Sequence, residues 1–344
     1  MSKDNENIPF FDDLPQPTEP AGFSYQQMVR CEECLRANPP TRVNCLYCGL
    51  ALPFSEASLA LAKPSLRPLE PWEQGYNNIL LRLRDDEPSE ELSNALASFL
   101  RQESSAIRRV LSAKRALPLA RTATPEEALL VERRLNDLGL ETVIVPDQDL
   151  HVDALPPRRL RRLELRETDF LAYQGSNADE IPIEWAEISL LIVGRLFVKQ
   201  IELRERKSRK AENEILDASE VMSDEAAVDI YVGKREESWR ISASNFDFSC
   251  LGKSKALLAG ENFPKLINMI RYHAPGAELN DSYAAVRHCL EMVWPSEKRS
   301  ASSGRRLGGS KHTTSAIITT TSELQFTRYS RLCHYLKRNS LVQP

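Results

Sequence analysis

The chain has 344 residues, 42% of them hydrophobic and 27% charged, and its formal net charge is −4. This length predicts two or three globular domains, since one domain usually has about 100–200 residues. The slightly acidic balance excludes a globally basic nucleic-acid-binding protein and leaves only local basic patches for such a role.

Residues 1–26 are acidic and rich in proline, which predicts a disordered N-terminus without a secretory signal. The longest apolar run, Ile188 to Val198, is interrupted by Arg195 and is shorter than the roughly 20 residues of a membrane-spanning helix. We therefore expect a cytoplasmic protein with no transmembrane segment. In a reducing compartment, the isolated cysteines are expected to be free thiols: Cys250, Cys289 and Cys333.

Two CxxC pairs lie within residues 27–53. Cys31 and Cys34 form the first pair, and Cys45 and Cys48 follow after ten residues. Such pairs supply the four thiolates that zinc prefers, and Gly49 allows a tight turn after the second pair. Because all four positions are cysteine, no coordination position is left for water, which is typical of a structural zinc site. A disulfide is disfavoured in a reducing cytoplasm, and an iron–sulfur cluster suits the spacing less well.

This segment resembles the short prokaryotic zinc ribbons. The matching residues are Cys31, Cys34, Asn38, Pro39, Pro40, Cys45, Cys48, Gly49 and Leu52. It is also similar to the zinc finger of Ran-binding proteins, although Val29 stands where that finger has a tryptophan. The resemblance implies Zn²⁺ as the cofactor and an attachment or interaction module that folds on its metal.

A linker is predicted for residues 54–76, which are rich in proline and small residues, with Trp72 as an anchor. Residues 77–150 predict a small domain with the order β-α-α-β-α-β. Ile79 begins alternating apolar positions, Ser89 opens the first helix, and Thr124 begins a capped helix. This order resembles the C-terminal domain of the bacterial ribosomal stalk protein, from which no binding residue is carried over.

Residues 158–275 are rich in strand patterns and end in a helix at Asn262 to His273. The arrangement resembles the bacterial pleckstrin-homology-like domains, which implies binding of a protein, a peptide or a lipid head group. Aromatic residues in the strands are interpreted as core positions: Trp185, Trp239, Phe246 and Phe248. The dense charge of residues 204–227 predicts an exposed loop or a loose helix as an insertion in this domain.

Residues 276–344 predict a helical tail. Helices are expected at Ser282 to Trp294 and at Ser322 to Lys337, where Ser322 and Gln325 suit a capping box. A basic flexible loop is expected between them, at 296–315. Residues 304–311 lack the spacing and the preceding strand of a phosphate-binding loop. Non-specific phosphate contacts remain an alternative for the basic residues Arg305, Arg306, Lys311 and His312.

No catalytic constellation is found in the sequence. The histidines have no metal-ligand spacing: His151, His273, His288, His312 and His334. His288 and Cys289 are neighbours on a predicted helix, so their side chains are expected to point to different faces. The site residues predicted are therefore the four zinc cysteines alone, with no catalytic residue and no other cofactor.

The sequence predicts an α+β protein made of a zinc ribbon, a small α/β domain, and a pleckstrin-homology-like domain with C-terminal helices. The favoured function is a zinc-binding, non-enzymatic interaction or regulatory (adapter) protein of the bacterial cytoplasm with a protein partner. An RNA- or ribosome-associated binding protein is one alternative, suggested by the ribbon and the basic tail. An enzyme with an unrecognised site is the other.

Overall fold

A computed structural model describes residues 23–24, 27–42, 44–50, 52–53, 64, 66–70, 73–84, 87–175, 180–207, 214–233, 237–307 and 311–341. The predictions for residues 1–22 and for Trp72 lie outside these ranges. The chain divides into two compact units, residues 1–65 and 66–344. Each unit is described by itself. No helix in the described ranges is both long and apolar enough to cross a membrane.

The first unit has very little regular structure. Strand β1 (Val29–Arg30) pairs with β2 (Ala37–Asn38) in an antiparallel hairpin. Its small core consists of Cys31, Cys45 and Leu52, with Val29 and Cys34 packed beside them. So small an apolar core stabilises a fold only weakly, which makes the cysteine side chains the main organising feature of this unit.

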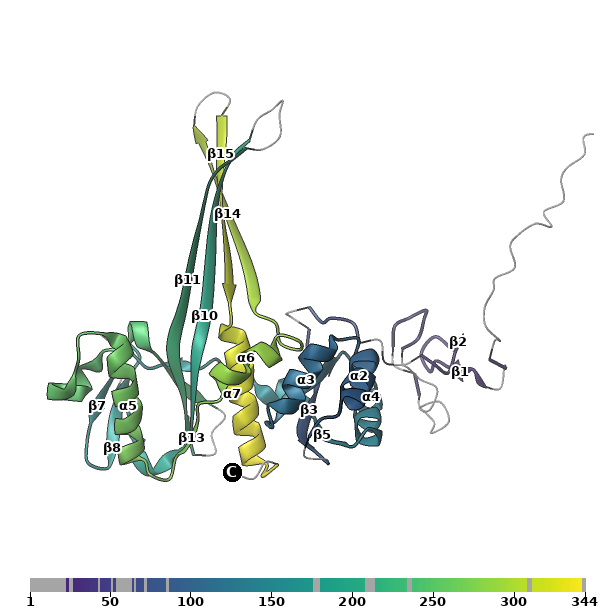
Figure 1. The fold of residues 1–344 in the computed structure, drawn as a ribbon, viewed down its shortest axis with the longest axis horizontal. Coiled ribbons are helices and arrows are strands. Elements are labelled where there is room, and N and C mark those ends of the chain that lie inside the picture. The colour runs from purple at the N-terminus through teal and green to yellow at the C-terminus, as the bar shows by residue number, and fades with distance from the viewer. Residues whose placement is uncertain are drawn as a thin grey trace, which may run out of the picture. The chain divides into compact units, whose positions relative to one another are not determined.

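The first part of the second unit confirms the predicted β-α-α-β-α-β order (Figure 1). The elements are β3 (Tyr76–Leu83), α2 (Glu90–Leu100), α3 (Ser104–Ser112), β4 (Leu117–Thr122), α4 (Pro125–Asp137) and β5 (Leu140–Pro146). The strands form an antiparallel sheet in the order β4-β3-β5. Two predicted helix starts are confirmed, because the hydroxyls of Ser89 and Thr124 accept hydrogen bonds from the N–H groups of Leu92 and Glu127.

The remaining strands form two sheets. Strands β7 (Arg162–Leu165), β8 (Asp169–Tyr173) and β9 (Ile181–Glu184) form the smaller one. The larger has the order β14-β15-β10-β11-β12-β6, with β13 beside β10. Its strands are β6 (Arg158–Arg159), β10 (Ile188–Lys207), β11 (Glu214–Val232), β12 (Ser238–Ser242), β13 (Glu278–Asn280), β14 (Glu297–Leu307) and β15 (Lys311–Thr321). Helices α5 (Ala259–His273), α6 (Tyr283–Leu290) and α7 (Glu323–Arg338) complete the unit, with short 3-10 turns between elements.

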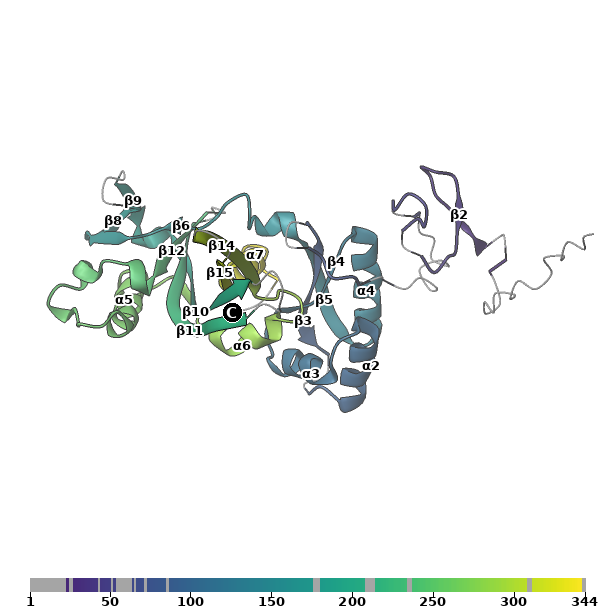
Figure 2. The same ribbon diagram turned by 90° about the horizontal axis from the view of Figure 1, so that it is seen from above.

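Two predicted loops are wrong. Within 204–227, residues 204–207 continue β10 and residues 214–227 belong to β11; within 296–315, residues 297–307 are β14 and 311–315 begin β15. The four strands run together away from α6 and α7, and Figure 2 looks along them. Alternating hydrophobicity reveals a strand only when one of its faces is buried. Strands exposed on both faces keep the polar composition of a loop, which explains the error.

Two hydrophobic cores lie in the second unit, and they do not follow the predicted domain boundaries. The first joins residues of the α/β part, including Leu96 and Val131, to α6, α7 and the base of β10. The second lies between α5, the small sheet and strands β10 to β12. At Gly194 on β10, an added Cβ would lie 2.5 Å from the ring of Phe326 on α7, so glycine allows this close approach. Helices α6 and α7 are thus part of a core and not a tail.

The predicted capping box at the start of α7 is also wrong. The Ser322 hydroxyl makes no cap bond and instead accepts a hydrogen bond from the N–H of Phe197 at 2.9 Å. The Gln325 amide donates to the carbonyl of Trp294 at 2.8 Å, and its oxygen accepts from the Tyr283 hydroxyl at 2.9 Å. Both polar side chains are buried. Their hydrogen-bond partners are distant in the sequence and not the neighbouring N–H groups that a capping box would use.

Candidate metal centre

Two backbone turns position the four cysteines of the first unit. In the first, the Cys31 N–H donates to the Arg36 carbonyl at 3.0 Å, and the Leu35 N–H donates to the Cys31 carbonyl at 3.0 Å. In the second, the Cys45 N–H donates to Leu50 at 2.7 Å, and the Gly49 N–H returns to Cys45 at 3.0 Å. Gly49 has a φ of 77°, a conformation that favours glycine and confirms the reason for a glycine after the second CxxC pair.

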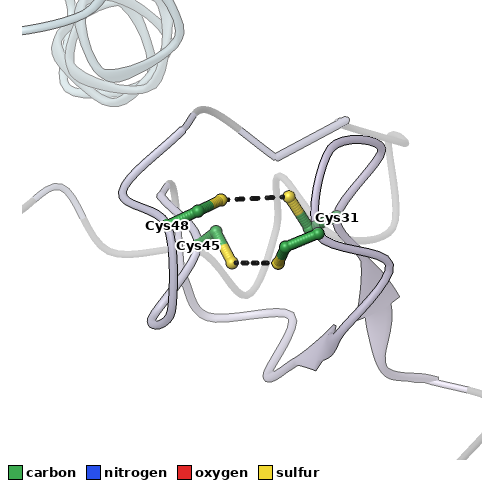
Figure 3. A group of neighbouring side chains, drawn as sticks. Cys31, Cys45 and Cys48 are labelled. Carbon is green, nitrogen blue, oxygen red and sulfur yellow. Dashed lines mark hydrogen bonds between the residues drawn. The ribbon is translucent and has the colours of Figure 1, made fainter.

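The four sulfur atoms converge on one point (Figure 3). All of them lie within 4.8 Å of one another. Cys31 Sγ is 3.5 Å from Cys48 Sγ, and Cys34 Sγ is 3.4 Å from Cys45 Sγ. A tetrahedral site with metal–sulfur bonds of about 2.3 Å has sulfur–sulfur edges of about 3.8 Å. The cluster therefore has the size and donor set of a four-thiolate site that could hold a metal ion.

Asn38, on strand β2, supports this cluster through its side-chain amide. Its side chain is fully buried; Nδ2 lies 3.5 Å from Cys45 Sγ and also donates to the Arg36 carbonyl at 2.9 Å. Its Oδ1 accepts the N–H of Leu46 at 2.9 Å. One amide therefore fixes both turns relative to each other. The sequence pattern included Asn38 among the ribbon residues but assigned it no role, because the burial of its amide beside a sulfur is visible only in the structure.

The four thiols do not ionise alike. Burial acts to raise the pKa of Cys45, but hydrogen bonds from the N–H groups of Cys48 and Tyr47 outweigh it and lower this pKa to about 6. At Cys48 the Leu50 N–H acts to lower the pKa, whereas burial and the neighbouring thiols raise it to about 12. Cys45 thus ionises readily, whereas ionisation of Cys48 is disfavoured. A bound divalent cation removes this conflict, because a coordinating thiol is deprotonated outright.

The four cysteines leave no open coordination position at which a bound metal could take a water molecule or a substrate. Four cysteines complete a tetrahedral shell, and Cys31 and Cys45 are buried while Cys48 is exposed. This is the only group of three or more His, Cys, Asp or Glu side chains arranged for a metal ion in the described part of the chain. The arrangement suits a structural role.

His288 and Cys289 are neighbours on α6. Their side chains lie on different faces, as expected, since His288 is exposed and Cys289 is buried; even so, His288 Nε2 lies 3.4 Å from Cys289 Sγ. The thiol is buried, and burial raises its pKa. A reactive cysteine needs the opposite shift. The contact is therefore a packing arrangement on α6 and not an activated pair.

The other histidines do not gather. His273 stacks on Trp185 at a centroid distance of 4.8 Å, His334 stacks on Tyr231 at 4.2 Å, and His151 lines a cavity of 440 Å³ beside Asp147. The side chain of His312 lies outside the described residues. The aromatic residues predicted as core are buried in the second core: Trp185, Trp239, Phe246 and Phe248.

No family model, no curated protein and no solved structure matches this chain. The resemblances to a zinc ribbon, a ribosomal stalk domain and a pleckstrin-homology-like domain therefore stay predictions. What the structure itself provides is an α+β fold and a cluster of four cysteines that could bind a metal ion.

Proposed function

We propose that the cysteine cluster binds one zinc ion and that the chain is a non-enzymatic adapter whose first unit docks onto a protein partner. The convergence of the four sulfurs within 4.8 Å of one another carries this proposal. Four soft thiolates in a tetrahedron favour zinc over the oxygen-seeking cations. A closed shell leaves the metal a structural role, so function is assigned to the surface that it holds in place.

The surface around the cysteines supports docking. Apolar side chains within or next to the two CxxC turns are about half exposed or more: Leu35 (66%), Leu46 (49%), Tyr47 (56%) and Leu50 (51%). The guanidinium of Arg36 lies over the Tyr47 ring at 4.6 Å, which holds that ring on the surface. Large apolar side chains that are exposed on so small a unit are typical of a protein-interaction site.

The test compares capture of a partner by four forms of the full chain. The partner is expected to bind the wild type, and to be lost both in Cys45→Ser/Cys48→Ser and in Leu46→Ser/Tyr47→Ser. Only the first of these variants should lose zinc, measured by elemental analysis. Leu129→Ser, which alters a leucine that is 53% exposed on α4, is the matched control and should keep the partner.

Three results would overturn the proposal. Unchanged capture by Leu46→Ser/Tyr47→Ser would remove the docking surface from these residues. Capture that disappears on ribonuclease treatment and at raised salt would replace the protein partner by RNA, since phosphate contacts weaken steeply with salt. A turnover activity that survives loss of zinc and maps to the second unit would make the chain an enzyme.

A further inference from the structure

The long strands of the second unit form an arm with no covering layer. We use "the arm" for residues 198–207, 214–224, 297–307 and 311–321, which belong to β10, β11, β14 and β15. At about 3.4 Å per residue, the ten residues of β10 in the arm extend about 30 Å. The arm begins where Phe197 is held by Ser322 at the start of α7.

Both faces of the arm are open to solvent at its outer strand. Val221 and Met222 are consecutive on β11 and therefore point to opposite faces, yet they are 62% and 60% exposed. The inner strands are better covered, since residues 316–321 of β15 are at most half exposed, whereas residues 218–224 of β11 and 298–301 of β14 are exposed. The exposed surface thus concentrates along the two outer strands.

Those outer strands have unpaired edges. In the strand order β14-β15-β10-β11, no described strand lies beyond β14, and β12 pairs with β11 only from Ala227 to Tyr231. The described stretch of β11 before Ala227 therefore pairs with β10 alone. Open edges of this length are templates for a further strand, and natural proteins usually cover them.

The two edges differ in charge. Along residues 218–225, β11 has Glu220, Asp224 and Glu225 and no basic residue. Glu220 binds Lys199 and Asp224 binds Arg287, each at 2.8 Å, but both carboxylates stay on exposed residues of the outer strand. Along residues 297–301, β14 has Lys298 and Arg299, and its single acid, Glu297, already binds Arg299 at 3.1 Å. Two β11 edges, or two β14 edges, would set like charges opposite each other, which is unfavourable. A β14 edge beside a β11 edge sets opposite charges together.

We propose that the arm binds the arm of a second copy of this chain, with β14 of one copy pairing along β11 of the next. The strand directions allow it, because every neighbouring pair within the arm is antiparallel, so β14 and β11 also run in opposite directions. Two arms that point the same way therefore continue the sheet with an antiparallel pair, the more stable kind of ladder.

The register brings the charges together. Lys298 is level with Met222 across the arm, through Thr320 and Lys199. Beside a neighbouring copy at the same level, Lys298 faces Met222 and lies diagonal to Glu220 and Asp224 on the same face. A shift of two residues in either direction places it directly opposite one of these carboxylates. Because the contact joins two different edges, it repeats from copy to copy into a ring or an open chain.

The test is the association state of the full chain, measured by sedimentation velocity over a range of concentration and salt. The wild type is expected to form dimers and larger species that dissociate as salt rises. Lys298→Glu should weaken association about tenfold, because it replaces attraction by repulsion at every contact. Lys298 has no partner among the described residues, so this change leaves the chain's own ion pairs intact. Arg133→Glu, an exposed site on α4, is the control with the same change in net charge.

A charge exchange separates pairing from a general effect. Glu220→Lys alone should also weaken association, although it removes the 2.8 Å contact of Glu220 with Lys199 as well. Lys298→Glu combined with Glu220→Lys in one chain should restore association, and so should a mixture of the two single variants. A wild type that stays monomeric at every concentration, equal behaviour of Lys298→Glu and Arg133→Glu, or a double variant no better than the singles would each overturn the proposal. Circular dichroism checks that each variant is folded.

Discussion

The indole N–H of Trp294 donates a hydrogen bond of 2.9 Å to the side-chain oxygen of Asn77, and both side chains are fully buried. Asn77 begins the α/β part of the second unit, and Trp294 follows α6 near its end. The amide group of Asn77 also donates to the Val145 carbonyl at 3.0 Å and to Asp147 at 2.9 Å. This one contact ties segments 217 residues apart into a single core.

Trp294→Phe is therefore expected to destabilise the whole second unit and not the C-terminal segment alone. The change leaves the Asn77 oxygen buried without a donor, which costs about 1–3 kcal/mol, and it adds a small cavity. Urea unfolding should still show one transition, shifted to lower urea. Arg82→Ala, which removes an exposed ion pair with Glu141, should change stability by less than about 1 kcal/mol. A separate early transition of residues 77–150 would contradict the shared core.

The buried ion pair of Asp229 and Arg240 should respond unequally to single and double replacement. The two residues are cross-strand partners on β11 and β12, joined by two hydrogen bonds of 2.7 and 2.8 Å, and both are at least 95% buried. Asp229→Ala leaves the buried Arg240 with only the half-exposed carboxylate of Glu323, 3.7 Å away, and should cost about 3–5 kcal/mol. Asp229→Leu combined with Arg240→Met should recover most of that loss. A double variant as unstable as the single one would show that Arg240 acts mainly through its other polar contacts, with Thr327 at 3.0 Å and Glu323 at 3.7 Å.

Stability is expected to fall in mild acid because of His334. Burial lowers the pKa of this histidine to about 4 from its ordinary value of 6.5, and the charges of Arg331 and Lys337 add to the shift. The unfolded chain therefore binds a proton between pH 6.5 and 4 where the folded chain does not, so the loss occurs as pH falls through this window. The loss attributable to His334 is about 2–3 kcal/mol. His334→Phe keeps an aromatic ring on Tyr231, and its unfolding free energy should fall less over the same range.

The sequence predicted features that depend on neighbouring residues better than features that depend on contacts between distant residues. The sequence predicted the cysteine cluster, the cap at Thr124 and the order of elements from Tyr76 to Pro146. Each of these features depends on residues that are close together in the chain. Ser322 and Gln325 had the local signature of a cap, yet their distant partners Phe197 and Trp294 hold them instead. Hydrogen bonds between residues so far apart in the chain leave no local pattern in the sequence.

The arm was missed for a different reason. Alternation of polar and apolar residues reports burial of one face, and Val221 and Met222 are exposed on both. Their strand is defined by backbone pairing with β10, which composition does not record. The role of Asn38 was missed because it also depends on tertiary structure. The sequence pattern named this residue, but its hydrogen bond to the Cys45 sulfur is visible only in the structure.

Asn38→Ala should therefore weaken metal binding although Asn38 is not a ligand. Its amide hydrogen bonds to Cys45 Sγ and to both CxxC turns, and loss of such a supporting group typically costs about 10–100-fold in metal affinity. Competition with a zinc chelator measures the loss, and the absorption of the cobalt-substituted protein checks that four thiolates still coordinate. Asn44→Ala is the matched control, because Asn44 donates to the Gly49 carbonyl at 3.2 Å and touches no sulfur. Equal affinity in the two variants would show that the backbone turns alone hold the cysteines in place.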